Sequence, residues 1–128
     1  MKSLVFGAIA ALLAIAPAHA QGWSSVHRYE RPSGKCPGRE VLASYYDTGY
    51  RTANGERFSA NANTAAARDW PMGAVLLVTN PKTGLSVRVR INDLGPWGIA
   101  YRVGDRLDLA RGAAHRIGMY GSQYVCVS

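Results

Sequence analysis

Cysteine and histidine, two of the residue types that most often hold metal ions, are scarce in this sequence. Its 128 residues include two cysteines, Cys36 and Cys126, and three histidines. None of them follows a spacing typical of zinc ligation, so we expect no metal site and no cofactor. Internal repeats and low-complexity tracts are also absent after the N-terminal segment, so nothing predicts a repeat architecture.

Long apolar runs are absent except at the N-terminus. Lys2 gives a positive start, residues 4–17 are apolar, and Ala-His-Ala at 18–20 fits a small-x-small cleavage site. This pattern predicts a signal peptide over residues 1–20 that leaves no transmembrane anchor after cleavage; an N-terminal core helix is the alternative. No cysteine follows the run, so we expect a periplasmic or secreted protein that is not a lipoprotein.

Acidic residues are also few, with 8 Asp and Glu against 15 Lys and Arg. Removal of residues 1–20 takes Lys2 away and leaves a formal charge of +6 on 108 residues, enough for one domain. A basic exported domain favours an anionic partner, such as a cell-wall polymer or a membrane surface. Export argues against nucleic acid, and a charge that serves only solubility is the alternative.

The two cysteines lie near the start and near the end of the mature chain. Because disulfides form in oxidising compartments, we expect Cys36 and Cys126 to pair. Such a bond would hold the first and last segments side by side.

The most regular pattern in the chain is an alternation that leads to Asp93. Its apolar members are Leu85, Val87, Val89 and Ile91, and its polar members are Ser86, Arg88, Arg90 and Asn92. A period of two predicts a half-buried strand. Gly95-Pro96 cannot continue a sheet ladder, so Asp93 is expected at the lip of the strand, just before Trp97.

Short elements fill the rest of the chain. We expect strands at 41–46, 74–79, 106–109 and 124–127, a helical turn at 63–68, and a helix at 110–117 with Gly118 at its end. The apolar strand at 74–79 is expected to be buried on both faces, and loops are expected at 47–55 and after Trp97. Short strands, brief helices and many glycine turns predict a mainly β protein folded as a small barrel.

Several segments, in this order, resemble the rare lipoprotein A (RlpA-like) family. They are 43–46 (ASYY), 52–56 (TANGE), 64–66 (TAA), 71–73 (PMG), 78–80 (VTN), 87–93 (VRVRIND), 95–96 (GP) and 107–109 (LDL). The resemblance implies a six-stranded double-psi β-barrel with one or two short helices over residues 41–128, preceded by an arm at 21–40. It also implies action on the glycan strands of peptidoglycan, and we expect a monomer.

Active members of this family look like lytic transglycosylases, which need an acid and a base at the glycosidic bond. By resemblance, Asp93 is the catalytic aspartate and Glu56 the second catalytic carboxylate. The family's histidine follows Thr-Ala-Ala, where this sequence has Ala67. Because a lost proton-transfer group costs about 10²–10⁴ in rate, weakened activity is expected. His115, in the predicted helix, is the one other histidine considered as a stand-in.

The alternative function is non-catalytic glycan binding or wall loosening, as in expansins, whose first domain resembles this barrel. Asp93 and Asp108 would then be the paired groove aspartates. The expected substrate-binding residues are Asp108, Tyr46, Trp97 and Asn92. Each carboxylate also has a structural alternative: a turn residue for Asp93, a helix N-cap for Asp108 and a solvated loop charge for Glu56.

Overall fold

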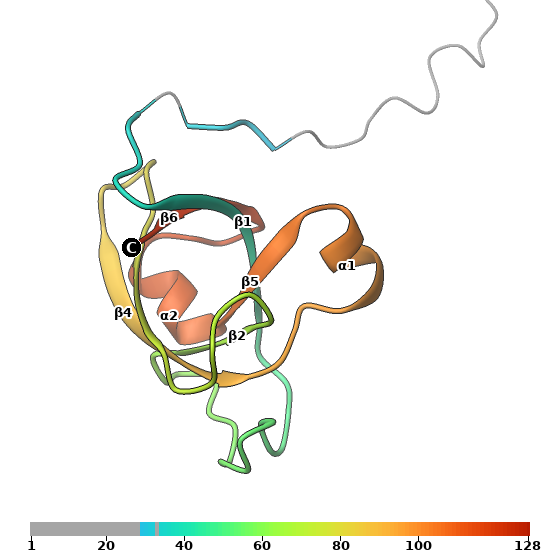
Figure 1. The fold of residues 1–128 in the computed structure, drawn as a ribbon. Helices are drawn as coiled ribbons and strands as arrows, with labels where there is room; N and C mark the ends of the chain where they lie inside the picture. The colour runs from blue at the N-terminus through green and yellow to red at the C-terminus, as the bar shows by residue number, and fades with distance from the viewer. Residues whose placement is uncertain (1–28, 33) are drawn as a thin grey trace, which may run out of the picture.

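The computed structural model describes residues 29–32 and 34–128. The predicted signal peptide and the first part of the predicted arm lie outside these residues. The elements, labelled in Figure 1 where there is room, are β1 (Arg39–Tyr46), β2 (Thr64–Ala67), β3 (Val75–Thr79), β4 (Ser86–Asp93), α1 (Gly98–Arg102), β5 (Asp105–Ala110), α2 (Arg111–Arg116) and β6 (Gln123–Val127). Within the described part of the chain, no helix has the length and apolarity needed to cross a membrane.

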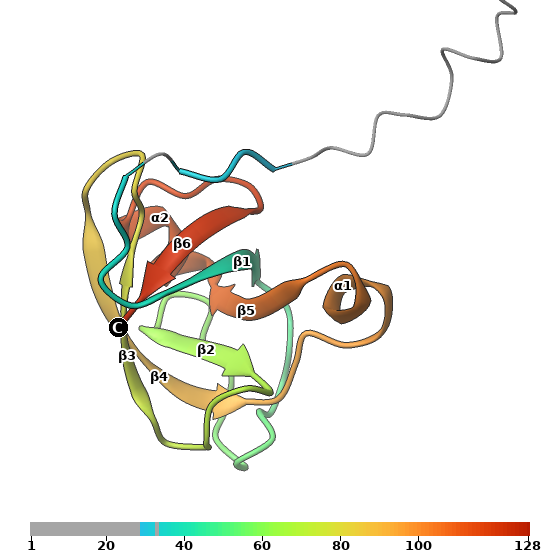
Figure 2. The same cartoon turned by 45° about the horizontal axis from the view of Figure 1, so that its top comes forward.

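The six strands close into one barrel in the order β1-β5-β2-β4-β3-β6, with β6 pairing back onto β1. Figure 2 shows β2 lying between β4 and β5. Two pairs are parallel, β1 with β5 and β2 with β4, and the other pairs are antiparallel. The predicted six-stranded, mainly β barrel with short helices is therefore confirmed.

The core lies inside the barrel and is built by alternate residues of each strand. Val87, Val89 and Ile91 of β4 are buried, while Ser86 and Arg88 are exposed, which confirms the predicted alternation in the middle of the strand. It is wrong at both ends, because Leu85 lies before β4 and is 51% exposed, and Asn92 is buried. Leu107 and Leu109 of β5 alternate in the same way, and α2 adds Ala113 and Ala114 to the same core. The strands are thus fixed by apolar residues facing inward, which leaves the intervening residues on the outer face.

The helical turn predicted at 63–68 is wrong, because Thr64–Ala67 is strand β2. Alanine favours a helix in isolation, but this segment lies between β4 and β5 and pairs with both. All four of its residues are buried. Hydrogen bonding on both edges of the strand outweighs the weak local preference.

Two smaller expectations also differ from the structure. Strand β3 is not buried on both faces, since Val75 is 60% exposed while Leu76 and Val78 are buried. A single-layer barrel leaves its outer face to solvent, so an apolar run need not be covered twice. The loop expected after Trp97 contains the short helix α1, which has no buried residue.

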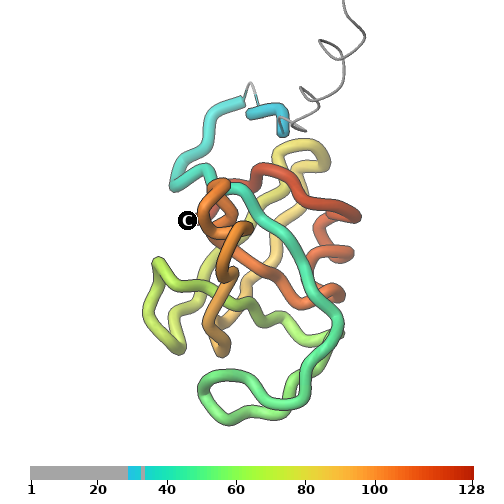
Figure 3. Tube along the Cα trace, turned by 90° about the vertical axis from the view of Figure 1, so that its right-hand side faces the viewer, coloured from blue at the N-terminus to red at the C-terminus, as the bar shows by residue number. Residues whose placement is uncertain are grey.

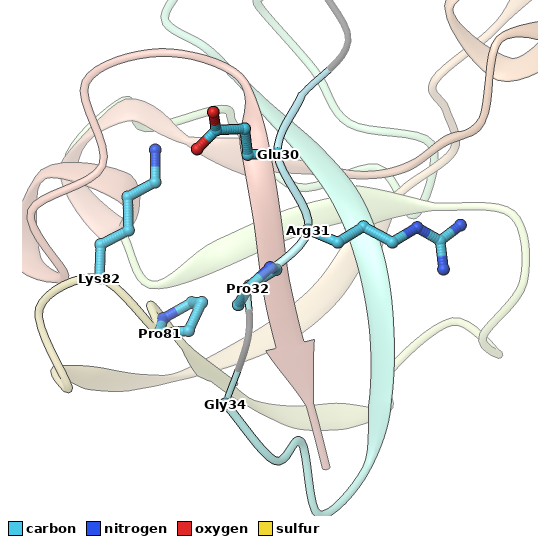
Figure 4. Close-up of a pocket in the computed structure, with 6 residues that line it drawn as sticks. All are labelled: Glu30, Arg31, Pro32, Gly34, Pro81 and Lys82. Atoms are coloured by element: carbon cyan, nitrogen blue, oxygen red, sulfur yellow. The ribbon is translucent and has the colours of Figure 1, made fainter.

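The arm before β1 is tied to the last strand. Cys36 and Cys126 form a disulfide with a Cα–Cα distance of 5.5 Å, as expected. Gly38 runs so close to β6 that a Cβ there would meet the carbonyl oxygen of Val127 at 2.0 Å. A cavity of about 400 Å³ lies between the arm and the β3–β4 turn. Figure 4 shows Glu30 of the arm and Lys82 of the turn among the side chains that line it.

The long loop between β1 and β2 lies at the other end of the barrel from the arm, as Figure 3 shows. Within it, the backbone N–H of Asn54 donates to the carbonyl oxygen of Asn92 at 3.3 Å. The loop also leans on α2, because the N–H of Gly112 donates to the carbonyl oxygen of Ala60 at 2.7 Å. It therefore covers the end of β4 at which Asp93 stands.

Candidate active site

A row of side chains crosses four neighbouring strands on the outer face of the barrel. Ser44 of β1 is the register partner of Asp108 of β5, Asp108 is the partner of Ala66 of β2, and Ala66 is the partner of Asp93 of β4. Laterally paired residues point to the same face of a sheet. The row therefore places two carboxyl groups on either side of the Ala66 methyl group, two strand spacings or about 10 Å apart at the backbone.

Asp93 reaches this row because β4 is bulged. Simple alternation after Val89 and Ile91 would send Asp93 toward the core. Instead Ala65 pairs with Ile91 and Ala66 pairs with Asp93, so one residue of β4 is skipped. A β-bulge re-aims the residue that follows it and is common beside functional sites.

The other parallel pair carries a matching irregularity. Leu42 of β1 pairs with Asp105 and Ala43 pairs with Leu107, so a residue of β5 is skipped. Asp105 consequently lies near Ser44, whose Oγ is 2.6 Å from Oδ2 of Asp105 and 3.2 Å from Oδ1 of Asp108. Each parallel pair thus uses a register shift to turn one aspartate toward the row.

Three donors surround the carboxyl group of Asp93. The backbone N–H groups of Ala53 and Leu94 each donate to Oδ1 at 2.9 Å, and the hydroxyl of Tyr46 donates to Oδ2 at 3.2 Å. The contact with Leu94 is the local turn bond expected for this residue, but the two contacts from distant segments show that Asp93 is also fixed to β1 and the long loop.

Tyr46 is held in place for this contact. Its ring is half-buried and stacks on Phe58, with ring centroids 4.7 Å apart and planes at 19°. Burial raises the pKa of the Tyr46 hydroxyl, and the neighbouring charge of Asp93 acts in the same direction. Tyr46 therefore remains a donor to Asp93 and is not a group that titrates near neutral pH.

Asp108 is half-buried and lies in a strand, so its alternative as a helix N-cap is wrong. The residue before α2 is Ala110, and no side chain caps this helix. Burial raises the pKa of Asp108 to about 6, and the charges of Asp105 and Asp93 add to the effect, while the contact with Ser44 opposes it. Asp93 and Asp108 therefore differ in environment, since one has three donors and the other is desolvated.

Glu56 lies beside the row, in an ion pair with Arg90. The two guanidinium nitrogens lie 2.5 and 2.9 Å from the two carboxylate oxygens. Asn54 and Asn92 donate to the same carboxylate at 2.8 and 3.3 Å. The hydrogen bond from Arg90, followed by those from Asn54 and Asn92, lowers the pKa of Glu56 to about 2. Glu56 is thus an ionised anchor that ties the long loop to β4.

Aromatic side chains flank the far side of Asp93. Trp97 is 58% exposed, and its Nε1 donates to the carbonyl oxygen of Leu94 at 3.1 Å. The guanidinium carbon of Arg68 lies 4.5 Å from the ring centroid of Trp97 and 4.0 Å from that of Tyr101. Trp97 is therefore the exposed aromatic surface that the sequence predicts, and Arg68 supports its ring from one face.

The fold agrees with comparisons to known proteins. A family model described as "Lytic transglycolase" matches residues 39–128. The chain belongs to this RlpA-like family of double-psi β-barrels.

Individual relatives of this chain are named endolytic peptidoglycan transglycosylases. The chain is 50% identical over 84 residues to the probable endolytic peptidoglycan transglycosylase RlpA of Synechocystis, covering 63% of this chain and 25% of the relative. It is 42% identical over 85 residues to the endolytic peptidoglycan transglycosylase RlpA of Campylobacter jejuni, covering 63% and 29%. The protein of that name from Pasteurella multocida is 40% identical over 87 residues, covering 66% and 28%. The chain spans about a quarter of the length of these relatives.

At position 67, where the resemblance implies a histidine, this chain has a core residue. Ala67 has no exposed surface and is the register partner of Leu107, so it faces the barrel interior. His115 does not replace the missing imidazole in the row. Its ring lies 5.4 Å from that of Tyr45 and 4.7 Å from that of Tyr120, in an aromatic cluster over α2.

The structure brings all the sequence-predicted site residues into one region, and it adds others. Tyr46 donates to Asp93, and Asp93 and Asp108 share the register partner Ala66. Asn92 is buried and donates to Glu56. Sequence reasoning missed Ser44, Asp105 and the stacking of Arg68 and Tyr101. The shared alternation of Ser44 with Tyr46 could have indicated Ser44. Within 29–32 and 34–128, no three His, Cys, Asp or Glu side chains are grouped to hold a metal ion.

Proposed function

We propose that this RlpA-like domain is a peptidoglycan lytic transglycosylase in which Asp108 and Asp93 carry the two proton transfers. The observation that supports this proposal is the pairing of both residues with Ala66, where burial raises the pKa of Asp108 and where Asp93 accepts three hydrogen bonds. Two carboxyl groups in different environments, one for the acid step and one for the base step, are typical of glycoside cleavage. The names of the relatives support the substrate class.

The reaction then proceeds without water. Protonated Asp108 gives its proton to the glycosidic oxygen while the bond from this oxygen to C1 of the muramic sugar breaks. The C6 hydroxyl of the same sugar attacks C1, and ionised Asp93 takes the proton that this hydroxyl loses. The products are a glycan with a free hydroxyl end and a glycan with a 1,6-anhydro end, so atoms and protons balance.

The remaining site residues position these two groups. Tyr46 and the N–H of Ala53 orient the carboxylate of Asp93. Glu56 holds the long loop through Arg90, which fixes the position of Ala53. Trp97 offers an exposed ring of the kind on which sugar rings stack. The predicted export of the chain by a signal peptide would deliver it to the compartment that contains peptidoglycan, where we expect it to act as a monomer.

A second candidate, glycan binding without cleavage, is favoured by one observation. Position 67 has alanine where the resemblance implies a catalytic histidine, and this alanine is buried. The groove with Trp97 and the two aspartates would then bind strands in the manner of an expansin-like protein.

Mass spectrometry of digested peptidoglycan separates the two functions. The protein would be incubated with purified peptidoglycan, with and without stem peptides, beside Asp93→Asn and Asp108→Asn. Anhydro-ended fragments that disappear in both variants are expected. Fragments produced equally by the variants would contradict the assigned roles, and sedimentation with peptidoglycan without any fragments would support the binding function.

A further inference from the structure

The hydroxyl oxygen of Ser44 stands between two carboxyl groups of β5. It lies 2.6 Å from Oδ2 of Asp105 and 3.2 Å from Oδ1 of Asp108. Asp105 is only 6% exposed, and its Oδ1 is 3.4 Å from the backbone nitrogen of Leu107. Neither Ser44 nor Asp105 has a part in the reaction as written above.

The number of available protons decides how these contacts can be made. A serine hydroxyl has one proton, so Ser44 can donate to only one of the two carboxyls at a time. A length of 2.6 Å is typical of a hydroxyl donating to an ionised carboxylate, and 3.2 Å is longer than that range. With the Ser44 proton directed at Asp105, the contact to Asp108 is a hydrogen bond only if Asp108 is protonated and donates to Ser44.

The reverse arrangement, with the proton on Asp105, fits the contacts less well. Burial raises the pKa of Asp105 as well, but the N–H of Leu107 donates to its Oδ1 whichever carboxyl the Ser44 proton faces, and the charge of Arg106 also favours the ionised form. Among the described residues, the side chain of Asp108 has no polar partner except Ser44. The ionised form is therefore better supported at Asp105 than at Asp108.

We propose that Asp105 is a positioning residue that acts through Ser44 to keep a proton on Asp108. The consequence for catalysis rests on the proposed function, because it assigns the acid step to Asp108. The location of the proton itself does not depend on any reaction. Asp105 and Ser44 would thus prepare the acid without touching the glycan.

The other groups around Asp108 act in the same direction. The titratable side chains that face it are Asp93 from β4, Tyr46 from β1 and Asp105 from β5 itself. Strand β2, paired with β5 on the other side, contributes only threonine and alanine. None of these groups is a cation that would stabilise an ionised Asp108. Burial raises the pKa of Asp108 to about 6. The contact with Ser44 opposes this only if the hydroxyl donates to Asp108, and a hydroxyl whose one proton points at Asp105 cannot do so.

The first test is a carboxyl ¹³C NMR titration of the wild-type protein without substrate. The proposal requires Asp108 to titrate at a higher pH than Asp105. The opposite order would overturn it without any variant having to fold.

The second test asks whether the effect passes through Ser44. Asp105→Asn should lower the titration midpoint of Asp108 by about one pH unit or more, as expected for removal of a neighbouring charge. In a Ser44→Ala background the same substitution should have less than half of that effect, because the connecting hydroxyl is gone. An equal shift in both backgrounds would mean that Asp105 affects Asp108 only through its charge. That result would contradict an effect that passes through Ser44. Asp47→Asn, an exposed aspartate just after β1 that lies 3.7 Å from Arg111, is the matched control and should leave the midpoint unchanged.

The third measurement follows peptidoglycan cleavage against pH. Because the acid must be protonated, the rate falls above the pKa of Asp108, and Asp105→Asn should move this fall to lower pH. Ser44→Thr keeps the hydroxyl and should stay close to wild type. If the wild-type protein cleaves peptidoglycan and Asp105→Asn has the same pH profile, the positioning role of Asp105 is rejected. The proposed function would not be affected by that result. Absence of cleavage together with the expected titration would reject the proposed function and leave the proton assignment standing.

Discussion

Asp93 and Asp108 are register partners of the same residue, Ala66, one on each side of β2. No other strand lies between the two carboxyl groups, so a sugar placed over Ala66 would have one of them on either side. Asp93 is held by three donors, whereas Asp108 is half-buried beside Ser44. The chemical difference between two like residues arises from these surroundings.

This difference predicts a pH profile for glycan cleavage. Activity should fall as the pH rises through about 6, because Asp108 then loses the proton that it must donate. Asp108→Asn should lower the rate by about 10²–10⁴ and remove this dependence from the residual activity. Initial rates of anhydro-end formation between pH 4 and 8 give both results. A rate that is constant across this range would contradict the assignment of Asp108 as the acid.

The ion pair of Glu56 with Arg90 predicts a stability of the fold that decreases as the pH is lowered. The pKa of Glu56 is lowered from 4.5 to about 2 in the folded protein, chiefly by the hydrogen bond from Arg90. The contribution of ionised Glu56 to the free energy of unfolding is therefore present above pH 4.5 and is lost as the pH falls toward 2. Urea denaturation should show Glu56→Gln less stable than wild type at pH 6, with the gap closing near pH 2.

The difference in stability between Glu56→Gln and wild type should be small and sensitive to salt, because the side chains of Glu56 and Arg90 are both about 40% exposed. Arg88→Gln is the matched control. It removes a charge from the same outer face of β4, at a residue with no salt bridge in the described part of the chain. A gap for Glu56→Gln that stays constant from pH 6 to pH 2 would show that its carboxylate is not held by the pair.

Placing a histidine at position 67, where the resemblance implies one, should not raise the rate of glycan cleavage. Ala67 faces the core, so a larger imidazole overfills it at a cost of about 1–3 kcal/mol. For a domain of this size, Ala67→His should lower the melting temperature by roughly 5–15 °C without an increase in cleavage rate. Calorimetry and the cleavage assay together check both parts. Increased cleavage at unchanged stability would mean that position 67 reaches the row.

The disulfide between Cys36 and Cys126 should stabilise the fold without taking part in the site. The variant Cys36→Ser/Cys126→Ser should lose about 2–5 kcal/mol of unfolding free energy. Its cleavage rate at a temperature where it stays folded should equal that of wild type, because β6 carries no residue of the row. Denaturation with and without a reducing agent checks the loss, and reductant should have no effect on the variant.

The alternation in β4 made much of the fold predictable. Its inward residues, from Val87 to Ile91, are buried as expected, and the strand ends at Asp93 before Gly95-Pro96. Strand β2 was mistaken for a helical turn because Thr64–Ala67 has no period of its own. Its strand conformation comes from the hydrogen bonds that β4 and β5 offer on either side.

The site was predictable in its residue types more than in its geometry. Asp93, Glu56 and Asp108 could be named from short segments, but their orientation depends on register shifts between strands distant in sequence. Alternation alone would have pointed Asp93 inward, and only its pairing with Ala66 shows the bulge. Asp105 was not considered because its neighbour Ser44 is 61 residues away in the chain. Contacts of this kind have no local signature.

The pairing of β1 with β6 also has a consequence for how quickly this domain can reach its native state. Arg39 lies opposite Val127 and Val41 lies opposite Val125, so the barrel closes through partners that are nearly the whole domain apart. The two parallel pairs are likewise formed by strands that are not consecutive. Domains dominated by such distant pairings fold in milliseconds to seconds, because loop closure must precede the contacts that reward it. A nascent chain of this protein would therefore remain without a closed barrel until β6 has been made. This delay leaves time for other proteins to bind the chain while it is still unfolded.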